Sequence, residues 1–139
     1  MIVIDTNVLS ELWRVAPDPK VLAWMDAQVV ETLFLSAITV AELRFGLAAM
    51  TQGKRRAIYQ ERLERELLPA FAGRVLPFDL DASKAYGELM ARARAAGLAI
   101  GNADGYIAAT AAARGLMIAT RDTSPFKAAG LTVIDPWAS

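Results

Sequence analysis

The N-terminal stretch Met-Ile-Val-Ile-Asp-Thr-Asn, residues 1–7, is the strongest indication of the fold. Its first four residues are apolar and uncharged, which predicts a strand that is buried on both faces of a sheet. Asp5 follows this strand at once, where no turn requires a charge. A carboxylate at the end of a buried strand indicates a site at the edge of the sheet, and Asp5 is its first candidate.

Strand-like and helix-like segments alternate through the rest of the chain. Short apolar runs predict further strands at residues 32–35, 74–78, 116–120 and 131–134. Helical spacing, caps and stop signals predict helices from residue 6 to Trp13, at 18–28, 38–50 and 54–68 (ended by Pro69), from a cap at Asp81 to Gly97, and at 102–114. This alternation predicts an α/β protein, a three-layer α/β/α sandwich with a mostly parallel central sheet, as a single domain over residues 1–139.

The composition excludes most kinds of catalytic site. The chain has no histidine and no cysteine, so it holds no Ser-His-Asp triad, no Cys nucleophile and no zinc site with nitrogen or sulfur ligands. Fifteen basic and fifteen acidic residues cancel, so net charge alone gives no sign of nucleic-acid binding. Any chemistry must therefore come from carboxylates, which suit a hard, oxygen-seeking cation.

Several features of the sequence lead us to expect a cytoplasmic protein. The absence of cysteine is compatible with a reducing compartment. The N-terminus lacks the basic region of a signal peptide. No apolar stretch approaches the roughly 18 residues that a membrane span needs, so no membrane association is expected.

Three further acids occupy positions comparable to that of Asp5. Glu42 lies near the start of the helix after the second strand, Asp104 lies in the first turn of a later helix, and Asp122 follows the next strand. The carboxyl ends of parallel strands meet at one edge of a sheet, so the four acids should converge there. Two carboxylates 4 Å apart repel by roughly 4 kcal/mol at an effective dielectric of 20, so such a cluster would require a cation.

Each acid also has a structural interpretation. Glu42 completes a capping-box pattern with Thr39, and Asp104 would interact favourably with the dipole at a helix N-terminus. Asp122 lies in an Arg-Asp-Thr-Ser-Pro stretch that is typical of a turn. Asp5 is the hardest to explain in this way. The convergence of all four on one edge favours a shared functional site.

Five stretches of the chain together resemble the PIN-domain family. They are MIVIDTNVLSEL from residue 1, LFLSAITVAELRFG from 33, IGNADGYIAATAAARG from 100, MIATRDTSPF from 117 and VIDPWA from 133. The likeness is to the VapC-type toxins of bacterial toxin–antitoxin pairs, including the FitB-like branch. It covers nearly the whole chain, with the stretches in the family's order.

This resemblance implies a ribonuclease that depends on Mg²⁺ or Mn²⁺. The family's catalytic acids match Asp5, Glu42, Asp104 and Asp122. Asp5, Asp104 and Asp122 would hold the metal, directly or through waters. Glu42 would complete the site or position the attacking water.

Small polar residues beside the acids match supporting positions of the family. Thr6 and Asn7 follow the first acid, and Thr120 precedes the last. The chain departs from the family at two places. Gly105 stands where many relatives carry a bulkier residue, which would loosen the helix start, and Pro125 stands where relatives often have Asp.

The resemblance also implies partners. We expect an RNA substrate, a homodimer or larger toxin–antitoxin assembly, and a cognate antitoxin whose tail covers the acidic pocket. Candidate RNA contacts are Arg44, two residues after Glu42, and Arg121, beside Asp122. The basic cluster at 54–56 is a weaker candidate, because a solvated helix face explains it equally well.

Two other functions remain open at this point. A PIN-like domain that has lost its catalysis could serve as a module that binds nucleic acid or protein, although the four acids argue against this. A haloacid-dehalogenase-type phosphatase also carries an acid at the end of its first strand. Such enzymes need Asp two residues later, where this chain has Asn7.

Overall fold

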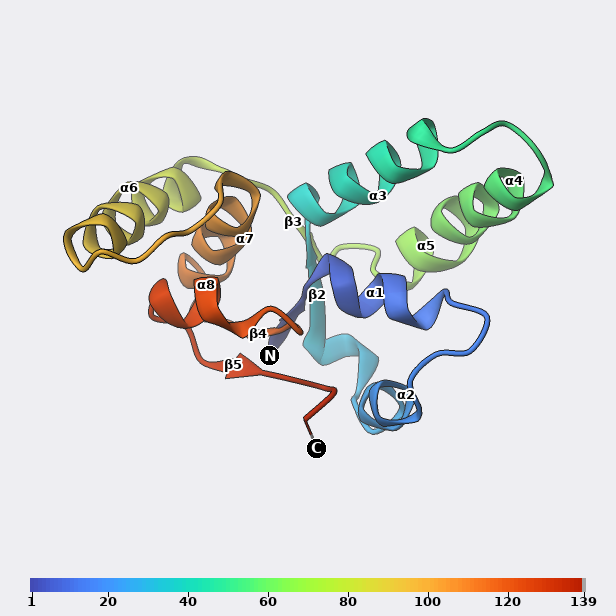
Figure 1. The fold of residues 1–139 in the computed structure, drawn as a ribbon, viewed down its shortest axis with the longest axis horizontal. Coiled ribbons are helices and arrows are strands. Elements are labelled where there is room, and N and C mark those ends of the chain that lie inside the picture. The colour runs from blue at the N-terminus through green and yellow to red at the C-terminus, as the bar shows by residue number, and fades with distance from the viewer. Residues whose placement is uncertain (139) are drawn as a thin grey trace.

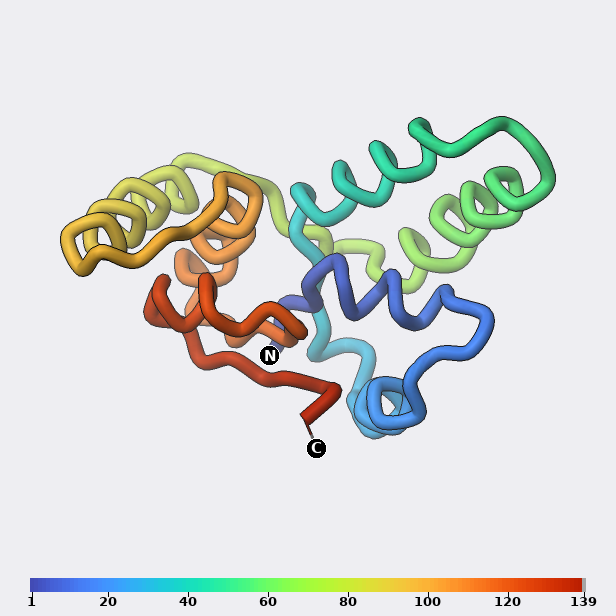
Figure 2. The backbone as a smooth tube through the Cα atoms, viewed as in Figure 1, coloured from blue at the N-terminus to red at the C-terminus, as the bar shows by residue number. Residues whose placement is uncertain are grey.

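A computed structural model describes residues 1–138, and its centre is a five-stranded sheet. The strands are β1 Ile2–Ile4, β2 Leu33–Ser36, β3 Val75–Leu76, β4 Met117–Ala119 and β5 Val133–Ile134. They lie in the order β3-β2-β1-β4-β5, and every pairing is parallel. The backbone trace in Figure 2 shows the N-terminal segment, in blue, beside the orange segment of β4, which comes more than a hundred residues later in the chain.

Helices connect the strands and cover both faces of the sheet (Figure 1). They are α1 Thr6–Leu12, α2 Pro19–Asp26, η1 Val30–Thr32, α3 Ala37–Ala49, α4 Lys54–Glu61, η2 Arg62–Leu67, α5 Leu68–Ala70, α6 Leu80–Ala95, α7 Asn102–Ala112 and α8 Thr123–Ala128. Among residues 1–138, none of these helices is both long and apolar enough to cross a membrane.

The side chains of β1 alternate between two hydrophobic cores. Ile2 and Ile4 pack in one core with residues of α1 and α3 such as Leu43. Val3 packs in the other core with Ile107 of α7 and with α8. Because successive side chains of a strand point to opposite faces, a strand buried throughout requires a helical layer on each face. The predicted three-layer sandwich with a parallel sheet is thereby confirmed.

The long helix predicted at 54–68 is interrupted. It begins as α4, widens into the π-helical turn η2 at Arg62–Leu67, and continues as the short α5 through Pro69. The prediction that Pro69 ends the helix is therefore wrong. Proline lacks the N–H that an α-helix needs and crowds the preceding turn, and the widened turn lies where this conflict arises.

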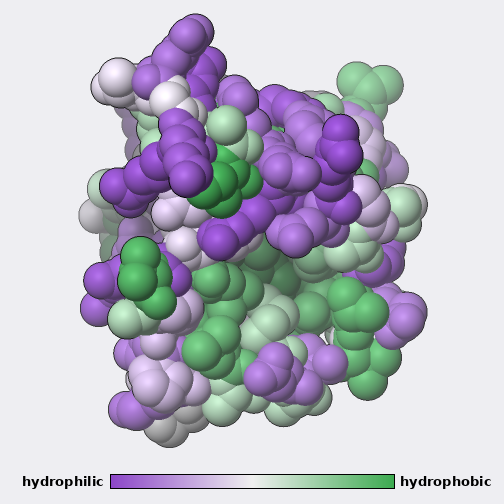
Figure 3. Space-filling model, turned by 90° about the vertical axis from the view of Figure 1, so that its right-hand side faces the viewer, coloured by the Kyte–Doolittle hydropathy of each residue, from purple (hydrophilic) through white to green (hydrophobic). Residues whose placement is uncertain are grey.

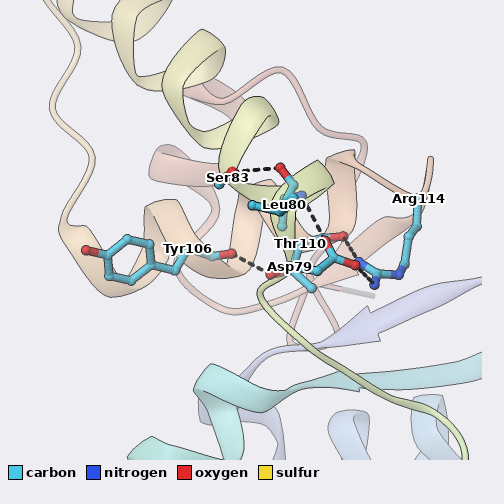
Figure 4. A network of polar contacts seen from close by, with 7 residues as sticks. Asp79, Leu80, Ser83, Tyr106, Thr110 and Arg114 are labelled. Atoms are coloured by element: carbon cyan, nitrogen blue, oxygen red, sulfur yellow. Dashed lines mark hydrogen bonds and ion pairs between the residues drawn. The ribbon is translucent and has the colours of Figure 1, made fainter.

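The cap of α6 is Asp79, which corrects the prediction of Asp81. The Asp79 carboxylate accepts a hydrogen bond from the backbone N–H of Ala82 at 3.0 Å, so the helix starts at Leu80. Its other oxygen accepts from the guanidinium of Arg114 at 2.8 Å, which ties the start of α6 to the end of α7 (Figure 4). This ion pair belongs to the scaffold and lies apart from the four acids.

The turn expected after Asp122 is in fact a helix. α8 begins at Thr123, and the sheet pairing of β4 ends just before it. Pro125 lies in the first turn of α8, where a helix does not use the missing N–H. The Thr-Ser-Pro sequence, which is typical of turns, is equally compatible with a helix start.

Gly105 lets α6 and α7 approach closely. A Cβ at this position would lie 3.0 Å from the sulfur of Met90 and 3.1 Å from Cε2 of Tyr86. α7 is nevertheless helical from Asn102 onward. The glycine therefore has a packing role, in place of the looser helix start that the resemblance implied.

Replacing Gly105 by valine should lower the free energy of unfolding by about 1–3 kcal/mol, because the added methyl groups must displace Met90 and Tyr86. Gly87 is a matched control, since it also lies inside a helix and a Cβ there would meet no atom within 4 Å. Gly87→Val should change the free energy by less than about 1 kcal/mol. Urea unfolding of both variants measures the difference, and equal losses would contradict the close contact.

Candidate active site

The ends of β1, β2 and β4 lead into one cavity of about 470 Å³, which we call the acidic cavity. Three of the four predicted acids line it, namely Asp5, Glu42 and Asp104. Asp5 follows β1, Glu42 lies on the helix after β2, and Asp104 lies in the first turn of α7. The sheet thus gathers acids that are about a hundred residues apart in the sequence, as the strand-end argument predicted.

Asp5 is held by a network of neutral donors. Its Oδ1 accepts from the backbone N–H of Thr6 at 2.8 Å, which makes Asp5 the N-cap of α1. Its Oδ2 accepts from the hydroxyl of Thr120 at 2.8 Å and from the amide of Asn7 at 3.5 Å. Thr6, Asn7 and Thr120 thus contact the acids, in the supporting positions that the resemblance implied.

The carboxyl group of Asp5 is buried, and no Lys or Arg among residues 1–138 forms an ion pair with it. Its residue is 5% exposed, and this burial raises the pKa of Asp5 to about 6. The hydrogen bonds from Thr120 and Thr6 act in the opposite direction and lower the pKa. The negative charges of Asp104 and Glu42 raise it further. A cation beside Asp5 would relieve both the burial cost and the repulsion.

Glu42 takes no part in capping α3. The helix begins at Ala37, where the side chain of Ser36 accepts from the N–H of Ile38 at 3.0 Å, so Glu42 lies in the second turn. The Glu42 Oε1 instead accepts from the hydroxyl of Thr6 at 2.7 Å. The capping-box interpretation is therefore wrong, and the glutamate is connected to the residues around Asp5.

Asp104 interacts electrostatically with the other acids. It lies in the first turn of α7 and makes no side-chain capping bond, although helix starts favour carboxylates. Partial burial raises the pKa of Asp104, and the charges of Asp122 and Glu42 raise it further. A structural role alone leaves this accumulation of negative charge unexplained.

Asp122 lies beside the acidic cavity and does not line it. It occupies the N-cap position of α8 without a side-chain capping bond. Its backbone N–H donates to the Thr120 hydroxyl at 3.1 Å, so the same hydroxyl contacts both Asp5 and the backbone of Asp122. The negative charge of Asp122 raises the pKa of Asp104, so Asp122 interacts electrostatically with an acid that lines the cavity.

The donor chemistry of the cavity suits Mg²⁺ or Mn²⁺, although the acids do not form a closed cage. Within residues 1–138, no three acids lie close enough together to hold an ion by themselves. Mg²⁺ typically keeps several waters and uses only one or two carboxylates, so an open set of acids is compatible with it. The neighbouring groups are hydroxyls and amides, which also offer oxygen.

Two arginines line the acidic cavity, and only one of them was a candidate from the sequence. Arg121, a candidate RNA contact from the sequence, lines the cavity. Arg14, which was not a candidate, also lines it. Arg44 forms an ion pair with Glu64 and does not line the cavity. Arg14 lies two residues beyond the end of α1, where it pairs with Glu11, so helical spacing from Thr6 does not single it out.

Thr120→Val should weaken the site by leaving an oxygen of Asp5 without its hydroxyl donor. We expect a loss of about 1–3 kcal/mol in the free energy of unfolding at pH 7.5, since hydrogen bonds to charged groups are the stronger ones. The pKa of Asp5 should rise further, which ¹³C NMR of its carboxyl group would measure. Thr132→Val is a control, because Thr132 is exposed. An unchanged pKa would contradict the contact.

The geometry above agrees with a match to a known family. Residues 2–131 match the PIN domain. The chain belongs to the PIN-domain family. The match covers all four candidate acids of this PIN domain and every strand except β5.

Two named relatives of this PIN domain are a ribonuclease and a toxin. It is 72% identical over 137 residues to VapC ribonuclease Y4jK of Sinorhizobium fredii, covering 99% of this chain and 98% of the relative. It is 50% identical over 137 residues to toxin FitB of Neisseria gonorrhoeae, covering 99% of each. The crystal structure of FitAcB from Neisseria gonorrhoeae superposes with a TM-score of 0.97 at 49% identity, covering 100% of both chains.

Proposed function

We propose that this chain is a Mg²⁺- or Mn²⁺-dependent endoribonuclease and the toxin component of a type II toxin–antitoxin pair. The observation that carries the proposal is the acidic cavity, where Asp5, Glu42 and Asp104 meet and where none of these three acids forms an ion pair among residues 1–138. Membership of the PIN-domain family and 72% identity to a VapC ribonuclease support RNA as the substrate.

Asp5, Asp104 and Asp122 would hold the divalent ion, directly or through waters. Such an ion lowers the pKa of a bound water and neutralises the charge that develops on the phosphate oxygens. Thr120 and Asn7 fix the orientation of the Asp5 carboxylate through hydrogen bonds. The residues around the first acid thus set its geometry before any ligand arrives.

Glu42 would position the attacking water. The Thr6 hydroxyl donates to one of its oxygens, so the carboxylate is held while its second oxygen can accept a further hydrogen bond. Because the chain has no histidine, the proton of that water must pass to a carboxylate or to solvent. The family resemblance implies products with a 5′-phosphate and a 3′-hydroxyl.

The test is cleavage of purified RNA by the purified chain, with Mn²⁺ or with EDTA. We expect Mn²⁺-dependent cleavage by the wild type, loss of most activity in Asp104→Asn, and full activity in Asp26→Asn, whose side chain is exposed at the end of α2. Cleavage that persists in EDTA would contradict the metal dependence. A catalytically silent binding module would show neither cleavage nor stabilisation by Mn²⁺.

A groove beside the acidic cavity supports an antitoxin as partner. This hollow of about 650 Å³ shares Thr6, Ser10, Arg14 and Glu42 with the acidic cavity. Figure 3, which views the side of the molecule where α4 lies, shows hydrophobic side chains around a hollow below a band of hydrophilic ones. An antitoxin tail lying there would reach the acids and could place an arginine among them.

Occupation of the acids by such an arginine predicts that the antitoxin tail and Mn²⁺ compete for the site. Calorimetric titration of the tail peptide should give a weaker affinity as Mn²⁺ increases, and independent binding would contradict this mode of inhibition.

The resemblance also implies a homodimer. Phe45 on α3 is 75% exposed, which is consistent with a surface that a second copy covers, and sedimentation would measure the assembly.

A further inference from the structure

Arg121 lines the acidic cavity without pairing with an acid. Its guanidinium carbon lies 5.2 Å from the ring centroid of Trp137, which also lines the cavity. In the part of the chain that the structure describes, the ion pairs are Arg14–Glu11, Arg44–Glu64 and Arg114–Asp79. The guanidinium of Arg121 therefore rests on an indole face, although several carboxylates line the same space.

The sheet brings Arg121 and Trp137 together. β4 and β5 are parallel neighbours, and the N–H of Thr120 donates to the carbonyl of Ile134 at 2.9 Å as the two strands end. Arg121 is the next residue after β4 and Thr120, and Trp137 lies three residues beyond Ile134. Their proximity follows from strand order and so was invisible as a sequence motif.

A tight turn fixes Trp137 in place. The carboxylate of Asp135 accepts from the backbone N–H of Trp137 at 2.9 Å, and the carbonyl of Asp135 accepts from Ala138 at 3.1 Å. Pro136 lies at the second position of this turn, where its fixed φ is favourable. The indole thus has a defined position, and it packs partly buried against the core on the α1 side of the sheet.

The backbone of Arg121 is fixed independently of its side chain. Its N–H donates to the amide oxygen of Asn7 at 3.2 Å. The side-chain torsions of Arg121 then determine whether its guanidinium contacts the indole or the acids. An arginine pairs readily with carboxylates, and such a pair would remove negative charge that a divalent ion needs. Contact with the indole face stabilises the guanidinium and leaves the negative charge of the acids available to a divalent ion.

We propose that Trp137 is a positioning residue, which holds the guanidinium of Arg121 at the rim of the acidic cavity for contact with an RNA phosphate. This inference rests on the proposed function, because it assumes an RNA substrate at the cavity. A guanidinium at the rim contacts the phosphate backbone without reading the bases. The same contact keeps the guanidinium of Arg121 away from the carboxylates, so Arg121 can contact RNA without occupying the position of the metal ion.

The test uses two variants of the full chain. Trp137→Leu keeps apolar bulk without an aromatic face, and Trp137→Phe keeps a weaker face. Fluorescence anisotropy with labelled single-stranded RNA in EDTA measures binding without cleavage. Trp137→Leu should weaken RNA binding by about three- to tenfold, and Trp137→Phe by less than about threefold. The half-saturating Mn²⁺ concentration should also rise in Trp137→Leu. Unchanged RNA and Mn²⁺ affinities in Trp137→Leu would overturn the inference.

A double-mutant cycle separates positioning from a general structural effect. In an Arg121→Ala background, Trp137→Leu should weaken RNA binding no further, because its target is already gone. An additional loss in that background would overturn the positioning role. Trp24→Leu is the matched control, since Trp24 is also partly buried against the same core but does not line the cavity. It should lower stability and leave RNA affinity unchanged.

The two proposals fail in distinguishable ways. If the wild type binds RNA in EDTA and the cycle behaves as expected, but Mn²⁺ produces no cleavage, then the ribonuclease assignment fails and the positioning role stands. If cleavage occurs and the cycle is additive, then only the positioning role fails. A wild type that binds no RNA in EDTA overturns the positioning role as well.

Discussion

Asp5→Asn should lower the rate of RNA cleavage by roughly a hundredfold or more while leaving the fold intact. Asparagine has nearly the same shape as aspartate, and it can still accept the hydrogen bond from the N–H of Thr6 that caps α1. It removes the charge that would hold a divalent ion. The loss should therefore appear in catalysis, with far-UV circular dichroism unchanged.

The measurement is a time course of cleavage at saturating Mn²⁺, with Asp26→Asn as the control for the substitution itself. A larger Mn²⁺ concentration should restore only part of the activity, because Asp104 and Asp122 remain. A variant at Asp5 that retained full Mn²⁺-dependent activity would show that the reaction takes place elsewhere on the molecule.

The metal-free protein should become less stable as pH rises from about 4 to about 6. Burial raises the pKa of Asp5 from 3.8 to about 6, so the folded state holds a proton that the unfolded state releases. The contribution of protonated Asp5 to the free energy of unfolding is therefore fully present below the unfolded pKa, and it is lost as pH rises through the folded pKa. The loss from Asp5 is about 3 kcal/mol at most, and the raised pKa of Asp104 acts in the same direction.

Urea unfolding in EDTA at several pH values between 4 and 7.5 measures this loss. Asp5→Asn should show a flatter profile, because asparagine does not titrate, and Mn²⁺ should restore stability to the wild type near pH 7. Subtracting the variant's profile from that of the wild type removes the contribution of the other carboxyl groups. Identical slopes for the two proteins would mean that Asp5 is not buried in the way described.

The features predicted correctly from sequence depend on local pattern and on the geometry of parallel sheets. The apolar run before Asp5 predicts a buried strand, and strand ends in a parallel sheet meet at one edge. These two facts bring Asp5 and Glu42 together, whereas Asp104 lines the same cavity because α7, which follows α6, begins at that edge. They cannot give the separation of the acids, which depends on side-chain rotamers, and Asp122 lies just outside the cavity lining.

The features that were missed depend on competition between local signals or on tertiary neighbours. Both Asp79 and Asp81 are capable caps for α6, and the contact between Asp79 and Arg114 lies beyond any local window. Pro125 is typical of a turn, yet it also fits the first turn of a helix. Trp137 closes the VIDPWA stretch, but only the pairing of β5 with β4 brings it to the cavity.

Calorimetric titration with Mn²⁺ at pH 7.5 decides whether these acids form a binding site for a divalent ion. We expect binding to the wild type and to Asp26→Asn, with affinity reduced at least about tenfold in Asp5→Asn and in Asp104→Asn. Equal Mn²⁺ affinity in all four proteins, or no binding to the wild type, would contradict this expectation.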